Sequence, residues 1–122
     1  MNPVGWFEIP VNDLDRVRTF YESVFGFQMS PQQPMGEYDM VFFPMEQGVP
    51  GAAGTLMKGM GYTPSRTGTV VYFQVEDIAA TLAKIERAGG KTIFPKKSIG
   101  QYGFIAWFED CEGNSVALHS MK

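Results

Sequence analysis

The strongest constraint on the fold of this chain is an internal repeat, in which the second half follows the first in a fixed register. When residues 1–58 are set against residues 65–122, ten of the 58 pairs are identical. A fixed period indicates one supersecondary unit that is used twice. The residues that recur unchanged are Val11, Asp13, Glu22, Gly26, Pro31, Gly36, Tyr38, Ala53, Met57 and Lys58. We therefore expect a single domain of two modules, about 1–58 and 69–122, with a Gly, Pro, Ser and Thr-rich linker at about 59–68.

Charge and composition exclude several classes of function. With 122 residues and an apolar fraction of 44%, the chain is long enough for one domain with a buried core. A net charge of −3 and the lack of a run of basic residues argue against nucleic acid as a partner. No stretch reaches the roughly 20 apolar residues that span a membrane. The single cysteine, Cys111, excludes an intrachain disulfide, and the N-terminus lacks a signal peptide, so we expect a cytoplasmic protein.

Each half of the sequence predicts the element order βαβββ. Asp13 and Asp77 are suited to cap helices, and Gly26 and Gly90 are suited to end them. Between these signals, apolar residues recur with the period of a helix. The first half predicts strands at 4–11, 27–29, 38–45 and 51–57 and a helix at 14–25. The second half predicts strands at 69–75, 91–94, 102–108 and 115–121 and a helix at 78–88. The fold class is therefore α+β, with two modules whose strands form a cupped mixed sheet around a concave cleft.

Alternation along the strands assigns residues to two faces. The face expected under the helices is aliphatic and aromatic and carries Phe7, Ile9, Val11, Leu56, Val71, Phe73, Val75, Val116 and Leu118. The other face mixes aromatic, amide, carboxylate and imidazole groups, as a small-molecule pocket does. It carries Trp6, Glu8, Pro10, Ala53, Thr55, Met57, Val70, Tyr72, Gln74, Ala117, His119 and Met121. Trp107 is a further candidate wall of the pocket, and the alternative for this face is partial solvation or a dimer interface.

Two segments resemble a known superfamily. Residues 8–16 (EIPVNDLDR), followed by Phe20-Tyr21 and 25–27 (FGF), resemble the opening of vicinal oxygen chelate proteins, and 108–114 (FEDCEGN) resembles the acidic turn before their last strand. The superfamily includes glyoxalase I, which is lactoylglutathione lyase, fosfomycin-modifying enzymes, extradiol dioxygenases, methylmalonyl-CoA epimerase and bleomycin resistance proteins. The resemblance covers both modules. It implies the paired βαβββ fold and, commonly, a homodimer.

The resemblance also implies four places where metal-dependent members carry His, Glu or Gln ligands. The first-strand place lies seven residues before Asp13, at Trp6, and the repeat adds Val70. The last-strand place lies four residues after Gly113, at Ala117, and the repeat adds Ala53. None of these four side chains offers a donor to a divalent metal. We therefore expect no metal at the usual site and no cofactor.

Glu8 and His119 are the candidate catalytic residues. A carboxylate and an imidazole on one cleft could act as an acid–base pair, or could be a hydrogen-bonded pair that only fixes the sheet. A metal at a relocated site would use Glu8 and His119, with Gln74 or Asp39 as helpers. Cys111 has acidic neighbours that raise the pKa of a thiol, which argues against a nucleophilic role.

The function that these features favour is metal-independent binding of a small molecule in the cleft. The residues expected to line it are Trp6, Glu8, Thr55, Val70, Tyr72, Gln74, Trp107, Ala117 and His119. The alternative is an enzyme, a lyase or isomerase of the lactoylglutathione lyase type that acts on a glutathione adduct or a small oxygenated metabolite. A third reading is an interaction module whose cleft is filled by its partner.

Overall fold

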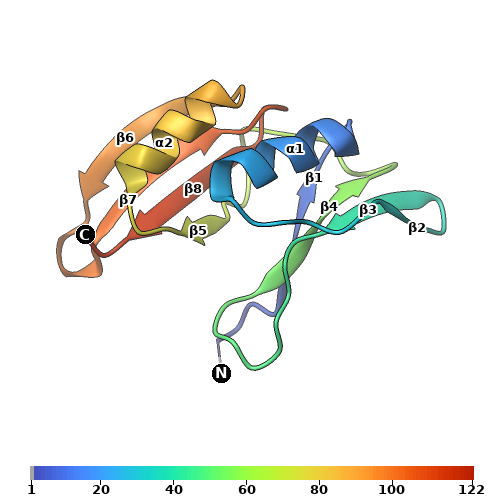
Figure 1. The fold of residues 1–122 in the computed structure, drawn as a ribbon, viewed down its shortest axis with the longest axis horizontal. Helices are drawn as coiled ribbons and strands as arrows, with labels where there is room; N and C mark the ends of the chain where they lie inside the picture. Colours follow the sequence, from blue (N-terminus) through green and yellow to red (C-terminus); the bar gives the residue numbers. More distant parts are fainter. Residues whose placement is uncertain (1) are drawn as a thin grey trace.

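The structure, a computed structural model, describes residues 2–122 as two modules with the same element order (Figure 1). The first module contains β1 (Trp6–Pro10), α1 (Leu14–Phe25), β2 (Gln33–Met35), β3 (Tyr38–Phe42) and β4 (Ala53–Lys58). The second contains β5 (Tyr72–Gln74), α2 (Ile78–Arg87), β6 (Lys91–Ser98), a 3-10 turn η1 (Gly100–Tyr102), β7 (Phe104–Glu109) and β8 (Ser115–Ser120). No helix of residues 2–122 has the length and hydropathy needed to cross a membrane.

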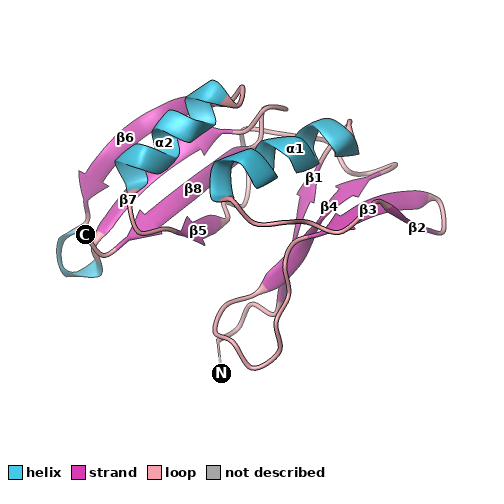
Figure 2. Cartoon of the chain, viewed as in Figure 1, coloured by secondary structure: helices cyan, strands magenta, loops and turns pink. Residues whose placement is uncertain are grey.

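The strands form two four-stranded mixed sheets with matching topology. The strand order is β1-β4-β3-β2 in one sheet and β5-β8-β7-β6 in the other. β1 pairs with β4 in parallel, and β5 pairs with β8 in parallel, while the other neighbours are antiparallel. Both helices lie side by side over one face of the sheets (Figure 2). The α+β class and the paired βαβββ modules are therefore confirmed, with β1 and β5 as edge strands.

The two helices begin at the residues that the sequence predicts. The Asp13 carboxylate accepts a hydrogen bond from the backbone N–H of Arg16 (3.1 Å), and Asp77 accepts one from Ala80 (3.0 Å). These bonds satisfy donors that a helix leaves unpaired in its first turn. At the end of α1, Gly26 adopts a φ of 75°, a left-handed conformation that favours glycine.

The core lies between the helices and the sheet faces that they cover. Ile9, Val11, Leu56, Val116 and Leu118 are buried there, and Phe7, Phe73 and Val75 pack against them, as predicted. An aromatic cluster joins the modules: Phe73 of β5 lies with ring centroids 5.9 Å from Phe7, 5.9 Å from Tyr21 and 4.7 Å from Phe25. Val71 is only half-buried, and it belongs to a cavity between the modules rather than to the core.

Four strand predictions are wrong in their bounds by three residues or more, and one of them is 38–45, since β3 ends at Phe42. Residues 27–29 form no strand, and the second strand of the module is β2 at Gln33–Met35. The reason is local. The N–H of Met29 donates a hydrogen bond to the carboxylate of Glu22, and the N–H of Phe42 donates one to the hydroxyl of Ser30. Side chains therefore replace part of the backbone hydrogen bonding that a strand at 27–29 would need. β5 is shorter than the predicted 69–75, and β6 is longer than the predicted 91–94.

The register of the sequence repeat holds through the first strands and helices but fails at the last strands. The N–H of Val11 donates to the carbonyl of Met57, and the N–H of Val75, its repeat partner, donates to the carbonyl of His119. The structural equivalent of Met57 is therefore His119, although the repeat sets Met57 against Met121. Met57 and Met121 are the same residue type but occupy different positions in the two modules. The same is true of Ala53 and Ala117.

A turn between β7 and β8 ties the second module to the first. Within it, Asp110 is buried and accepts hydrogen bonds from the phenol of Tyr21 (2.9 Å) and from the amide of Asn114 (3.0 Å). Glu112 accepts from the N–H groups of Asn12 (2.6 Å) and Asp13 (3.0 Å), just before α1. The acidic turn of the family pattern is therefore a structural clamp in this chain.

Candidate functional site

The main cavity lies at the seam between the edge strands β1 and β5 and has a volume of about 760 Å³. This size is typical of sites for drug-sized organic ligands. These two strands and the residues just before them supply most of its wall, and the loop before β4 and Phe27 complete it. The lining residues are Val4, Trp6, Phe7, Glu8, Phe27, Phe43, Pro44, Gly51, Ala52, Thr69, Val70, Val71, Tyr72, Phe73 and Gln74.

Five of the residues predicted to bind a ligand line this cavity: Trp6, Glu8, Val70, Tyr72 and Gln74. The indole of Trp6 is 42% exposed and the ring of Tyr72 is 46% exposed, although both are large and apolar. Such exposure of aromatic side chains at a concave surface is typical of a binding site. Phe42 supports Trp6 by an edge contact, with ring centroids 6.0 Å apart.

The other four predicted residues do not line the cavity. Thr55 and Ala117 are buried, and the hydroxyl of Thr55 has no hydrogen-bond partner among residues 2–122. Trp107 stacks on Phe94, with centroids 5.5 Å apart, and its indole N–H donates to the hydroxyl of Tyr72 (3.0 Å). Trp107 thus acts on the cavity through Tyr72, which it orients.

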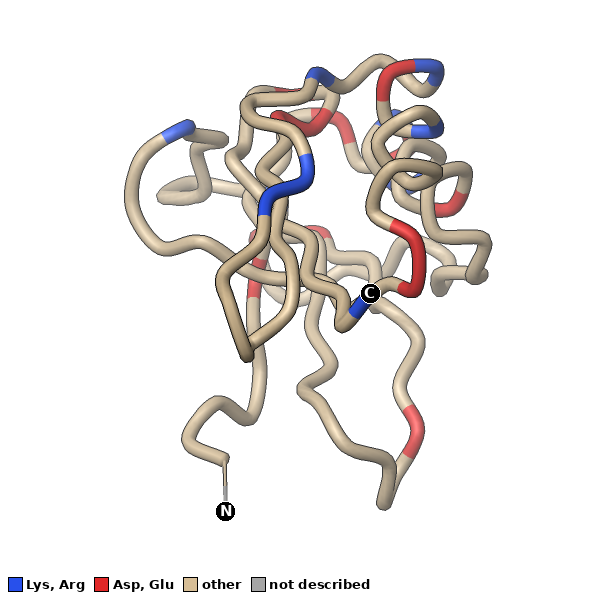
Figure 3. The backbone as a smooth tube through the Cα atoms, turned by 90° about the vertical axis from the view of Figure 1, so that its left-hand side faces the viewer, with Lys and Arg blue, Asp and Glu red and all other residues tan. Residues whose placement is uncertain are grey.

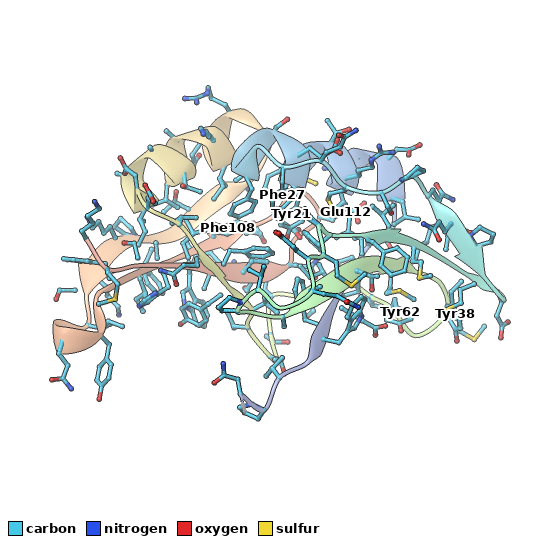
Figure 4. All side chains as sticks on the ribbon, turned by 60° about the horizontal axis from the view of Figure 1, so that its bottom comes forward. Tyr21, Phe27, Tyr38, Tyr62, Phe108 and Glu112 are labelled. Atoms are coloured by element: carbon cyan, nitrogen blue, oxygen red, sulfur yellow. The ribbon has the colours of Figure 1, made fainter. Side chains whose placement is uncertain are left out.

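Glu8 is held by a residue that the sequence analysis did not select. The phenol of Tyr62, in the linker, donates to Oε1 of Glu8 (2.8 Å), and this hydrogen bond raises the pKa of Tyr62. Tyr38 packs against Tyr62 edge to face, with centroids 5.7 Å apart (Figure 4). Tyr62 is the only aromatic residue of 59–68, and that singularity in a Gly, Pro, Ser and Thr-rich segment is the signal that could have identified it.

His119 has partners of its own and is not paired with Glu8. Its Nε2 lies 2.6 Å from the carbonyl of Tyr102 and its Nδ1 lies 2.8 Å from Oε1 of Gln74. Because a carbonyl oxygen can only accept a hydrogen bond, Nε2 carries the proton in the contact with Tyr102. The ring thereby fixes the turn η1 against β8. The predicted acid–base pair of Glu8 and His119 is not formed by a hydrogen bond in the described chain.

Strand pairing corrects one of the four places expected for metal ligands. Glu8 and Phe42 lie opposite Thr55, whereas Tyr72 and Trp107 lie opposite Ala117. The equivalent of Ala117 is therefore Thr55, and the repeat-based choice of Ala53 is wrong. The four places then carry Trp6, Thr55, Val70 and Ala117, which include one neutral hydroxyl and no imidazole, thiolate or carboxylate.

The relocated metal site at Glu8 and His119 lacks a third ligand. Residues 2–122 contain no group of three His, Cys, Asp or Glu side chains that could hold a metal ion. Asp39, the predicted helper, precedes Met40 on β3, and Met40 pairs with Met57. Strand alternation places Asp39 on the opposite face from Met40 and Phe42, and thus away from Thr55. The amide of Gln74 is engaged by His119.

Cys111 does not provide a nucleophile. Burial, followed by the charge of Asp110, raises the pKa of its thiol to about 12, and the guanidinium of Arg16 offsets only part of this. The thiolate is the reactive form of cysteine, so the side chain is inert near neutral pH.

Comparison of sequences identifies a family and two relatives. A family model described as the Glyoxalase/Bleomycin resistance protein/Dioxygenase superfamily matches residues 4–118. A glyoxylase-like domain-containing protein of Didymella fabae is 28% identical over 118 residues, which cover 94% of this chain and 91% of the relative. A lactoylglutathione lyase of Haemophilus influenzae is 29% identical over 118 residues, which cover 92% of this chain and 87% of the relative.

Comparison of structures shows the same fold in more distant proteins. A glyoxylase/bleomycin resistance protein/dioxygenase domain from Frankia sp. EAN1pec superposes with a TM-score of 0.76 at 16% identity, over 100% of this chain and 99% of that chain. A mutant of glyoxalase I from Zea mays superposes with a TM-score of 0.72 at 20% identity, over 97% of this chain. The match covers 46% of the maize chain, so this chain spans about half the length of that enzyme.

Proposed function

The chain belongs to the Glyoxalase/Bleomycin resistance protein/Dioxygenase superfamily, and we propose that it binds a small organic molecule in the seam cavity without a metal ion. The observation that carries the proposal is the cavity of about 760 Å³ between β1 and β5, with the exposed rings of Trp6 and Tyr72 in its wall. Apolar walls with a few polar groups are the usual lining of ligand sites.

The donor set supports a function without metal. A divalent metal in this superfamily would act as a Lewis acid on a bound oxygen. Trp6, Thr55, Val70 and Ala117, at the places where the resemblance puts its ligands, do not fit such an ion. What this chain offers instead is one carboxylate, Glu8, oriented by the phenol of Tyr62 at the edge of an aromatic cavity.

A titration of chelator-treated protein with planar aromatic probes tests this function. Acridine, proflavine and acridine-9-carboxylate share one ring system, and each is expected to enter an aromatic cavity to some extent. At least one of them should quench the fluorescence of Trp6, measured in a Trp107→Phe variant that leaves Trp6 as the only indole. Binding, followed by the fluorescence of the acridine itself, should also weaken at least fivefold in Trp6→Ala. If none of the three binds in metal-free buffer, the proposed function is wrong.

The second candidate is lyase activity on a glutathione hemithioacetal, and the name of the Haemophilus relative is what favours it. In this chain the reaction would depend on Glu8 and His119, because they are the acid–base groups of the concave face. Turnover of the hemithioacetal of methylglyoxal by metal-supplemented protein, lost in Glu8→Gln, would establish this activity in place of simple binding.

We further propose a cytoplasmic homodimer. The sheets also end at β2 and β6, on the sides away from the seam, and exposed strand edges favour association with another chain. The unpaired Cys111 suits a reducing compartment. Light scattering coupled to size-exclusion chromatography should give twice the monomer mass of 13.6 kDa.

A further inference from the structure

We propose that the ligand of the seam cavity is an organic cation with an aromatic body, and that Glu8 holds its positive charge. The proposal rests on the proposed function, since it takes the seam cavity as the binding site. It adds the chemical class of the ligand, and that class follows from the charge, contacts and ring exposure of the lining residues.

Glu8 is the only charged side chain among the described residues that line the cavity. The ion pairs of residues 2–122 lie elsewhere, between Arg16 and Glu112, Arg18 and Glu22, and Arg66 and Glu109. Glu8 therefore has no basic partner within the described chain. A carboxylate beside apolar walls attracts a cation more strongly than one in open water, because filling the cavity lowers the local dielectric constant.

The chain segments that build the cavity contain no lysine or arginine. Residues 2–15, 43–52 and 67–83 supply almost the whole lining, and none of their side chains is basic. Figure 3 shows the same distribution, because the N-terminal segment and the loop before β4 carry no blue in that view. The lining of the cavity therefore carries one negative charge, that of Glu8, and no positive charge.

Tyr62 orients the carboxylate of Glu8 without neutralising it. Its phenol donates to Oε1, and no hydrogen bond reaches Oε2 within residues 2–122. The phenol is protonated at neutral pH, and its raised pKa keeps it so in mild alkali, so it stays a neutral donor to a charged carboxylate. One carboxylate oxygen thus remains available for an ammonium or amidinium group.

The aromatic walls suit the body of such a cation. Trp6 and Tyr72 present exposed rings, and their positions are fixed by Phe42 and by the indole N–H of Trp107 respectively. An aromatic face attracts a cation through its quadrupole and stacks on a planar ring. A planar cation is therefore stabilised both by the rings of Trp6 and Tyr72 and by the carboxylate of Glu8.

The same features disfavour anionic ligands. A glutathione adduct is a net anion with two carboxylates and one ammonium group, and the described lining offers no lysine, arginine or histidine to receive the carboxylates. Bringing a carboxylate near Glu8 would add like-charge repulsion. The charge of the cavity thus separates an organic cation from the substrate of the alternative lyase function.

The test uses three acridines of similar size: proflavine, a cation at neutral pH, acridine, which is neutral, and acridine-9-carboxylate. Full-length protein in metal-free buffer is titrated with each. Wild-type protein should bind proflavine at least tenfold more tightly than acridine and the carboxylate least of all. Glu8→Gln, which keeps the shape and removes the charge, should weaken proflavine at least tenfold and leave acridine within twofold. Glu37→Gln, on an exposed loop away from the cavity, is the matched control and should change neither.

The outcomes distinguish this inference from the function on which it rests. Equal affinity of wild type and Glu8→Gln for proflavine, with acridine still bound, would overturn the cation assignment and leave the binding function standing. Failure of all three probes would overturn both. A circular dichroism melt of Glu8→Gln that matches the wild type establishes that a loss of affinity reflects the charge and not the fold.

Discussion

The phenol of Tyr62 lies 2.8 Å from Oε1 of Glu8 and joins the linker to the first strand across 54 residues of sequence. Removing this phenol in Tyr62→Phe should raise the affinity for proflavine about threefold, because the phenol no longer competes with the ligand for the charged carboxylate. The measurement is a titration of both proteins in the same low-salt buffer.

The Tyr62 prediction has its own control and its own contrary result. Tyr102→Phe removes another exposed phenol that does not line the cavity, and it should leave the affinity unchanged. A tenfold loss of affinity in Tyr62→Phe would mean that the phenol itself contacts the ligand or that the carboxylate needs it to point into the cavity.

Glu112 should contribute strongly to the coupling of the two modules. Its side chain is only 4% exposed, and it accepts the N–H groups of Asn12 and Asp13 at the start of α1. Glu112→Ala leaves these two donors unpaired near a helix N-terminus, so we expect a loss of about 2 kcal/mol in the free energy of unfolding. Urea titration followed by circular dichroism measures the loss.

Glu86→Ala is the matched control for Glu112, because Glu86 also accepts a backbone N–H, that of Thr92, but within one module and in an exposed position. It should be less destabilising than Glu112→Ala. Equal effects of the two substitutions would contradict a special role of the acidic turn in joining the modules.

The buried pair of Tyr21 and Asp110 predicts a loss of stability in alkali. Burial, and then the charge of Asp110, hold the pKa of Tyr21 well above its usual value of 10.0. The unfolded chain therefore releases this proton at lower pH than the folded chain does. The stability that follows from this difference is complete below pH 10 and falls as the pH rises beyond it.

Tyr21→Phe tests this dependence. At neutral pH the variant should lose about 2 kcal/mol of unfolding free energy, because the buried carboxylate of Asp110 loses a donor. Above pH 10 the stability of the variant should decline less steeply than that of the wild type. Parallel declines would show that other tyrosines, of which Tyr62 also has a raised pKa, dominate the alkaline transition.

The thiol of Cys111 should resist alkylation while the protein is folded. Its pKa of about 12 leaves almost no thiolate at pH 8, whereas the unfolded chain has the usual pKa of 9.0. Iodoacetamide should therefore modify Cys111 at least tenfold more slowly in the native protein than in urea at the same pH, as followed by mass spectrometry. Similar rates in both states would mean that the turn opens readily.

The features that could be predicted from the sequence are those that depend on local signals. The caps at Asp13 and Asp77, the helical period between cap and glycine, and the alternation on β1 and β8 all depend on residues within one element. For that reason the helices, the βαβββ order and the buried faces could be predicted. The five lining residues Trp6, Glu8, Val70, Tyr72 and Gln74 lie on or beside the two first strands, where the repeat keeps its register.

The parts that failed depend on how separate segments meet. The loop between β3 and β4 spans 43–52, whereas the turn between β7 and β8 spans only 110–114, so one constant spacing cannot align both the first and the last strands. The identity of Ala53 and Ala117 concealed this difference. The contact of Tyr62 with Glu8 and the two partners of His119 are likewise tertiary, and no local pattern in the sequence encodes them.

Divalent metal ions should leave the stability of this protein unchanged. Trp6, Thr55, Val70 and Ala117 provide no charged donor, and Glu8 and His119 are bonded to Tyr62 and to Gln74 and Tyr102 respectively. A site of micromolar affinity would add about 4 kcal/mol at roughly millimolar metal, because binding stabilises the folded state by mass action. We therefore expect thermal melts of chelator-treated protein to coincide with and without about 1 mM nickel, zinc or manganese.

A clear rise in the melting temperature that disappears in Glu8→Gln and in His119→Asn would place a metal at the relocated site and would make the enzymatic alternative the leading one. A rise that both variants retain would point to metal bound elsewhere, and a melt of the Glu37→Gln control reports any effect of removing one surface charge.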